Sequence, residues 1–204
     1  MIRKENIACT PSALKQSGVE SSVFTTDTLA IREMTGWKIS RLHVLPRAEQ
    51  PDFASIELPK YVGECLGTSP VVLCLRPREW LFLDHSAEAS EAPAWEQKEN
   101  GSAFWSDLSD GLTVFRIEGA GAPWLLNKVS GLDYQSWHAA AAHCARTRMG
   151  QIAVVVHFHR TPDDGDVFDL VVDRSIARYV WELLCASAPH ANDLARATGP
   201  LDLT

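Results

Sequence analysis

The 204-residue sequence has no long hydrophobic run and no excess of positive charge. A membrane-spanning helix needs about 20 mostly apolar residues, and no segment of the sequence approaches that length. The 19 Lys and Arg residues are outnumbered by 26 Asp and Glu residues, giving a net charge of -7. Because no basic surface is expected to hold phosphates, we expect neither nucleic acid nor a membrane as a partner. The polar first 20 residues lack the apolar core of an export signal.

Cysteine is also sparse, with five residues, an odd count, and no paired spacing of the kind found in disulfide frameworks or zinc sites. Reduced thiols and a cytoplasmic location are therefore expected. Two catalytic motifs are missing, the Gly-x-Ser-x-Gly nucleophile elbow and the Lys-Ser/Thr ending of a phosphate-binding loop. What the sequence does contain is apolar: it is 46% hydrophobic and has seven tryptophans, enough for a sizeable core.

The order of apolar patterns predicts an α+β fold of two similar strand-helix-strand-strand-helix lobes with mainly antiparallel sheets. We place a flexible N-terminal tail at 1–22, a first lobe at 23–105, a second lobe at 106–188 and a C-terminal tail at 189–204. The two lobes match in pattern and not in residues, so a chance likeness is the alternative to a structural repeat.

Individual elements follow from periodicity, turn residues and caps. The expected strands are 29–34 at a sheet edge, 37–44, 71–75, 80–83, 112–118, 148–158 and 167–172. The expected helices are 59–66, 120–129 and 175–187, with Asp173 and Ser175 competing to cap the last and Pro189 beyond its end. The segment Pro162-Asp163-Asp164-Gly165 predicts a turn.

Two histidines are the main candidates for chemistry. His157 and His159 alternate with Phe158 at the end of an apolar strand, so both imidazoles point to the same side of the sheet. They could share a metal ion, but no third ligand is recognisable at a supporting spacing. The alternative is a solvated strand end. Asp169 and Asp173 could share a strand face, where an acid is usually solvated.

Other residues offer weaker signals. His138, His143 and Cys144 could supply a thiol nucleophile, but nothing provides an oxyanion cradle, and a buried thiol with surface imidazoles is favoured. The run from Gly119 to Pro123 resembles a phosphate cradle only superficially and is read as a tight strand-to-helix turn. Arginines at 76, 78, 146, 148, 174 and 178 could bind a carboxylate or tie loops to the body. Tryptophans at 37, 80, 95, 105, 124, 137 and 181 either serve an interface or fill the core.

A set of short segments resembles the gamma subunit family of heterotetrameric sarcosine oxidase, within the glycine-cleavage T protein and tetrahydrofolate-binding superfamily. The clearest is the nonapeptide LCLRPREWL at 73–81. The others are 107–109, 118–120, 125–128, 131–133, 146–147, 168–175 and 179–181. Together they span roughly residues 71 to 187.

The resemblance implies an aminomethyltransferase folate-binding-domain-like fold and a role in a four-chain flavoenzyme. That enzyme oxidises sarcosine to glycine and delivers the one-carbon unit to tetrahydrofolate. FAD, FMN, NAD and zinc are then expected on partner subunits, with no cofactor, metal or catalytic residue on this chain. The expected partners are the alpha subunit, which this chain would brace, and the beta and delta subunits.

The sequence departs from its folate-using relatives at Gly150. Those relatives carry an acidic pair after this glycine, whereas here Gln151-Ile152-Ala153-Val154 follows. The iron-sulfur-repair relatives carry a cysteine before it, which is also missing. Both departures argue against folate chemistry, and a stand-alone tetrahydrofolate-binding protein is therefore the second hypothesis.

Overall fold

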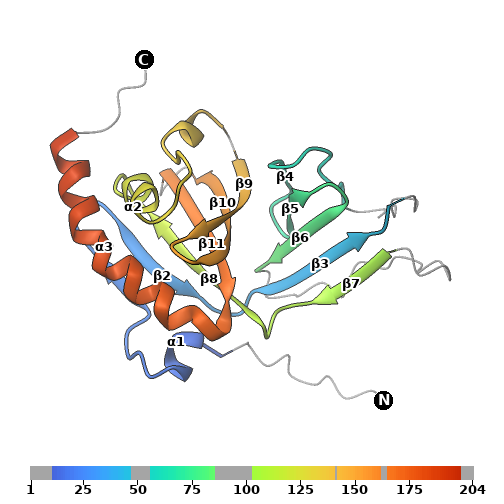
Figure 1. Ribbon diagram of the computed structural model, residues 1–204, viewed down its shortest axis with the longest axis horizontal. Coiled ribbons are helices and arrows are strands. Elements are labelled where there is room, and N and C mark those ends of the chain that lie inside the picture. Colours follow the sequence, from blue (N-terminus) through green and yellow to red (C-terminus); the bar gives the residue numbers. More distant parts are fainter. Residues whose placement is uncertain (1–10, 47–55, 86–102, 141, 162–164, 199–204) are drawn as a thin grey trace.

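The computed structural model describes residues 11–46, 56–85, 103–140, 142–161 and 165–198. Within these ranges the chain forms two β-sheets, and two helices cover one face of the larger sheet (Figure 1). The six strands of this larger sheet are, in spatial order, β1 (Val23–Thr25), β2 (Ala30–Met34), β8 (Leu112–Glu118), β11 (Gly165–Asp173), β10 (Ile152–Thr161) and β9 (Ala142–Met149).

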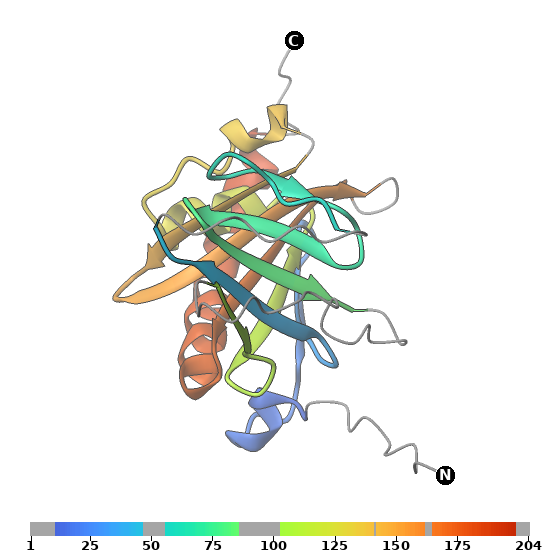
Figure 2. The ribbon, with the colours of Figure 1, turned by 90° about the vertical axis from the view of Figure 1, so that its right-hand side faces the viewer.

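A second, five-stranded sheet lies against the face of the first that the helices leave open. Its strands are, in spatial order, β4 (Cys65–Leu66), β5 (Val71–Arg76), β6 (Glu79–Asp84), β3 (Lys38–Val44) and β7 (Ala103–Asp107). Figure 2 looks onto this sheet, with the six-stranded sheet and the helices behind it. Every neighbouring pair of strands in the two sheets is antiparallel. The predicted α+β class with mainly antiparallel sheets is confirmed.

The layers follow from alternation along the strands. On β10, Val154, Val156 and Phe158 pack in the cluster that includes the helices α2 (Ala122–Val129) and α3 (Ala177–Thr198). Because side chains alternate across a strand, Val155 and His157 face the five-stranded sheet instead. The inter-sheet cluster joins Val114 and Val171 of the larger sheet with apolar residues of the smaller one, namely Trp37, Ile39, Leu73, Leu75, Leu81 and Leu83.

The described part of the predicted N-terminal tail is ordered. Residues 13–16 form a short helix, α1 (Ala13–Gln16), and its Leu14 is completely buried. Ser12 caps this helix by accepting a hydrogen bond from the Lys15 amide, and the Ala13 amide donates to Glu33 at 2.7 Å. The prediction of a flexible tail is therefore wrong for residues 11–22, where one buried leucine and one glutamate fix the chain.

The C-terminal helix is longer than predicted, because α3 runs through Pro189 to Thr198. A proline inside a helix removes a hydrogen bond and crowds the preceding turn, which is why the sequence predicted an end before it. Tertiary contacts override that cost: Ala191 is fully buried, and the Asn192 carboxamide accepts hydrogen bonds from the Thr28 amide and hydroxyl. The predicted tail at 189–204 is wrong up to residue 198.

The predicted helix over 59–66 is also wrong. The Glu64 carboxylate accepts hydrogen bonds from the Lys60 and Tyr61 amides, both at 3.0 Å, and Gly63 adopts a φ of 95°. These contacts close a turn, after which β4 pairs with β5. A β-carbon on Gly63 would lie 2.6 Å from the His143 ring, so the turn needs a glycine both for its backbone angle and for space.

Two strands differ from their predicted places. The predicted strand over 148–158 is interrupted by a tight turn at Gly150: Arg148 and Met149 end the edge strand β9, which begins at Ala142 where no strand was predicted, and β10 begins at Ile152 and pairs with β9. Strand β2 is not at an edge, because it lies between β1 and β8. Residues 23–34 thus join the sheet of the predicted second lobe, so the sheets do not divide at residue 105.

Two short 3-10 helices, η1 (Ser136–Ala139) and η2 (Arg174–Ile176), complete the described secondary structure. No helix among the described residues has the length and apolar character that a membrane crossing requires. Residues 162–164 of the predicted turn lie outside the described residues, and on either side of them Thr161 pairs with Gly165.

Candidate functional site

The β10–β11 hairpin places two imidazoles beside one carboxylate. In its register His157 lies directly opposite Asp169, and His159 lies two residues further along the same face. Asp169 was expected to be solvated, but it is completely buried. That expectation is wrong, because the face of β11 that carries Asp169 is covered by the five-stranded sheet. A third side chain that could bind a metal ion, which the spacing of the histidines did not reveal, therefore lies on the adjacent strand.

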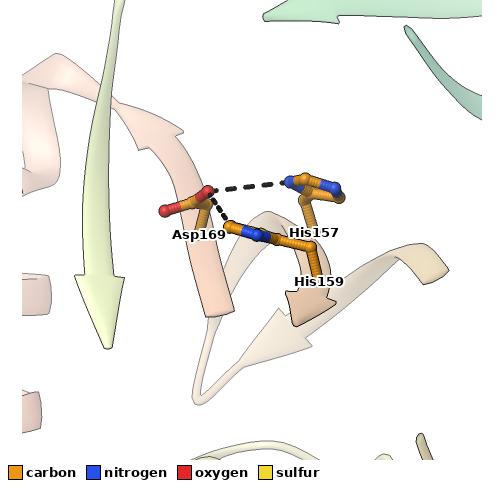
Figure 3. Close-up of side chains that lie close together, drawn as sticks. All are labelled: His157, His159 and Asp169. Carbon is orange, nitrogen blue, oxygen red and sulfur yellow. Dashed lines mark hydrogen bonds and ion pairs between the residues drawn. The ribbon is translucent and has the colours of Figure 1, made fainter. Parts of the chain in front are cut away.

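Figure 3 shows both rings directed toward the same carboxylate oxygen. Nε2 of His159 lies 3.0 Å from Oδ2 of Asp169, and Nδ1 of His157 lies 3.6 Å from it. The second distance is too long for a hydrogen bond, so His157 Nδ1 has no hydrogen-bond partner although it is buried. The two rings stack with their centroids 4.8 Å apart and an interplanar angle of 16°.

Arg116 on β8 completes the cluster from the other side. Its guanidinium binds the carboxylate through two bonds, Nε to Oδ1 at 2.8 Å and Nη2 to Oδ2 at 3.0 Å. The same group lies 5.8 Å from the Trp37 ring centroid, a cation–π contact with the five-stranded sheet. This fork geometry fixes the orientation of Asp169.

The surroundings of the cluster set the protonation states of Asp169 and His157. Burial alone would raise the pKa of Asp169, but the contacts with His157, His159 and Arg116 lower it well below the usual range of a carboxyl group. Burial lowers the pKa of His157, although the nearby carboxylate partly opposes this shift. At neutral pH the site therefore contains an ionised carboxylate and a neutral, buried imidazole. Neutral imidazole and ionised carboxylate are the forms that bind metal ions.

A cleft between the two sheets lies toward the other end of β10, with a volume of about 260 Å³. Its walls combine apolar residues, among them Leu75, Leu81 and Val155, with the charged residues Arg41, Glu79, Arg146 and Asp173. Arg146 pairs with Glu79 at 3.6 Å, and the Arg41 side chain has no ion pair or hydrogen bond within the described part of the chain. A partly apolar cleft with two arginines suits a ligand that has a flat body and a carboxylate.

The structure does not assemble a thiol nucleophile from the other histidines. Cys144 is buried, and its thiol donates to the Glu64 carbonyl. His138 lies elsewhere, with Nδ1 2.6 Å from Asp166, and His143 packs edge-on against Trp137. The buried-thiol interpretation of Cys144 agrees with these contacts.

The glycine turn before α2 is filled by its own chain. A β-carbon on Gly119 would lie 2.4 Å from the Thr28 carbonyl oxygen, and the Gly121 amide donates to that oxygen. The helix start is therefore covered by Thr28, as the tight-turn interpretation requires, and offers no cradle for a phosphate.

Most of the arginines and tryptophans considered as candidates make contacts that stabilise the fold. Arg174 donates to Gln16 and to the Pro11 carbonyl, tying the N-terminal segment to η2, and Arg178 pairs with Glu182. Trp37, Trp80 and Trp181 are buried, with 4–8% of each side chain exposed. Trp95 lies outside the described residues. Core packing thus accounts for these three tryptophans, and the described tryptophans form no exposed aromatic surface.

Comparison with known proteins returned no matching protein-family model and no matching curated protein. Among solved structures, the heterotetrameric sarcosine oxidase from Corynebacterium sp. U-96 in complex with pyrrole 2-carboxylate contains a chain with the same fold. The TM-score is 0.68 at 17% identity, and the match covers 89% of this chain and 96% of that chain. At this identity the likeness establishes the fold. The high coverage of both chains also means that they have nearly the same length.

Proposed function

We propose that this chain is the non-catalytic gamma subunit of a heterotetrameric sarcosine oxidase-like complex, in which it braces the large alpha subunit. The observation that supports this proposal is the fold match to one chain of such an oxidase, which covers almost all of both chains. The complex would demethylate sarcosine to glycine in the cytoplasm and pass the one-carbon unit to tetrahydrofolate. FAD, FMN, NAD and zinc would lie on the alpha, beta and delta partners.

An exposed and rigid apolar pair supports a role in protein contacts. The side chains of Tyr61 and Val62 are 70% and 57% exposed. They project from a turn that Glu64 closes and that is tied to both sheets, because the Gly63 amide donates to Cys74 of β5 and the Gly63 carbonyl accepts from Cys144 of β9, both at 2.9 Å. A preordered tyrosine loses little entropy on binding, and tyrosine is enriched at interface hot spots.

Affinity purification from the native host tests this proposal. We expect the tagged chain to retain a larger flavin-containing protein, detected by its visible absorbance, and to lose most of it when Tyr61→Ala and Val62→Ser are combined. Val23→Ser is the matched control, because Val23 is 54% exposed on β1, away from this turn. Elution of the tagged chain alone, free of flavin, would contradict the proposal.

The alternative function is a stand-alone tetrahydrofolate-binding protein, and the inter-sheet cleft is the observation that favours it. Arg41 and Arg146 beside apolar walls suit the carboxylate and ring of a folate. Calorimetry with tetrahydrofolate decides between the two: micromolar binding by the isolated chain, weakened at least about tenfold by Arg146→Gln, would support this alternative. No heat of binding would leave the subunit proposal in place.

A further inference from the structure

We propose that Nδ1 of His157, Nε2 of His159 and Oδ2 of Asp169 bind one divalent transition metal ion, with Zn²⁺ as the representative ion. The three donor atoms all lie within 4.8 Å of one another. Two imidazoles and a carboxylate are a ligand set that zinc and its neighbours in the first transition series accept. The proposal concerns this chain alone and does not depend on its place in a complex.

The first argument is the unsatisfied nitrogen of His157. A buried polar atom without a partner costs free energy, and Nδ1 of His157 is such an atom, in a residue that is only 4% exposed. It faces the Asp169 carboxylate at 3.6 Å, a gap too wide for a hydrogen bond. An ion placed between the two atoms would give the nitrogen a partner and would bind the carboxylate as well.

The second argument is the spacing of the donors. Zinc bonds to nitrogen and oxygen are about 2.0–2.2 Å long, so neighbouring donors in a tetrahedral site lie about 3.4 Å apart. The two distances from Asp169 Oδ2, 3.0 Å to His159 and 3.6 Å to His157, bracket that value. The hairpin register therefore supplies two of the three donor separations without movement of the backbone.

The third separation is the one between the two ring nitrogens, and one ring has to rotate to reach it. A ring nitrogen binds a metal in the plane of its ring, and the two rings are stacked 16° from parallel. They therefore cannot both point at one ion as they stand. His159 has room to rotate, because 23% of its side chain is exposed, whereas His157 is enclosed. We expect the His159 ring to move, leaving the fourth position of the ion on the exposed side for water.

Arg116 sets the strength of the site. It binds both carboxylate oxygens, Nε to Oδ1 at 2.8 Å and Nη2 to Oδ2 at 3.0 Å, so Oδ2 has to share its lone pairs between Nη2 and the ion. Such an outer contact orients the ligand, but the positive charge of Arg116 opposes a cation nearby. The affinity is therefore expected to be lower than that of a structural zinc site with several charged ligands.

Calorimetric titration with zinc tests the site in the full chain, prepared with a tag that contains no histidine and freed of metal beforehand. We expect saturable binding of one zinc ion per chain, and a loss of affinity of at least about tenfold in His159→Ala. His138→Ala is the matched control, because His138 also lies beside a carboxylate, with Nδ1 2.6 Å from Asp166 Oδ2, but outside the three-residue site. It should bind as the unaltered chain does.

A second set of measurements checks that the His159→Ala variant is folded. Circular dichroism should give His159→Ala the spectrum of the unaltered chain, since the replaced side chain is partly exposed. Zinc should raise the melting temperature of the unaltered chain and of His138→Ala, and leave that of His159→Ala unchanged. The proposal is overturned if the unaltered chain shows no saturable zinc binding, or if His159→Ala binds zinc as tightly as the unaltered chain.

Discussion

Replacing Asp169 by asparagine should be among the most damaging single polar substitutions in the larger sheet. The change keeps the shape of the side chain and removes the charge that Arg116 and the two imidazoles surround. Breaking a buried ion pair by removing one partner costs about 3–5 kcal/mol. Because the Arg116 side chain is 20% exposed and keeps its contact with Trp37, we expect the lower end, about 3 kcal/mol.

Asp166→Asn is the matched control on the same strand. Asp166 pairs with Arg160 at 3.0 Å and with His138 at 2.6 Å, but these two partner side chains are 41% and 49% exposed, so the loss of the charge should cost about 1 kcal/mol or less. Urea denaturation in the presence of a chelator measures both. With a slope of about 2–3 kcal/mol/M, the Asp169 variant should unfold at a urea concentration about 1–1.5 M lower.

The pH dependence gives this prediction a second test. The folded pKa of Asp169 is depressed, so its stabilisation is complete above the unfolded pKa of about 3.9 and is lost as the pH falls below it. The stability difference between the unaltered chain and Asp169→Asn should therefore be widest near neutral pH and narrow below about pH 4. A loss no larger than that of Asp166→Asn, or a difference that does not change in acid, would show that the buried ion pair does not stabilise the chain in this way.

Three further predictions concern the fold around the site. Gly63→Ala should lower the free energy of unfolding by about 2 kcal/mol in thermal denaturation, because of its φ of 95° and the nearby His143 ring. Gly18→Ala should cost less, because φ is 81° there but the space is open. Equal losses in the two variants would show that contact with the His143 ring adds nothing. Leu14→Ala should cost about 3 kcal/mol by urea denaturation, whereas a loss as small as that of the exposed neighbour Lys15→Ala would mean that α1 is not part of the core. The pKa of His157 is lowered in the folded chain, so the chain should lose stability as the pH falls below about 6.5. His157→Leu should reduce this loss, measured as the fall of the melting temperature between pH 7 and 5. An unchanged fall would show that protonation of His157 does not cause the loss.

Local patterns predicted much of the larger sheet. Strands β8 and β11, residues 152–158 of β10 and the helix α2 follow from alternation and turn residues, and Leu112–Glu118 was predicted with its observed bounds. The predicted turn at 162–165 also implies a register for the site. When Thr161 pairs with Gly165, as the structure shows, His157 lies opposite Asp169, so the cluster could have been predicted from the sequence.

Several failures share one cause, which is contact between residues far apart in the chain, whereas the predicted helix over 59–66 fails because of a local turn that Glu64 closes. Asp169 is buried because a second sheet covers it, and its partner Arg116 is 53 residues away. α3 continues through Pro189 because Asn192 binds Thr28, 164 residues away. β9 is rich in alanine and arginine, and only pairing with β10 makes it a strand. None of these contacts can be predicted from the hydrophobic periodicity of the segment in which it occurs.

Native mass spectrometry of the assembly purified from the host, through a tag on this chain, is the most direct test of the proposal that the chain is a subunit of a flavin-containing complex. We expect a mass made up of four different chains, with this one present once and flavin released on denaturation. A mass equal to the single chain, or to copies of this chain alone, would contradict it.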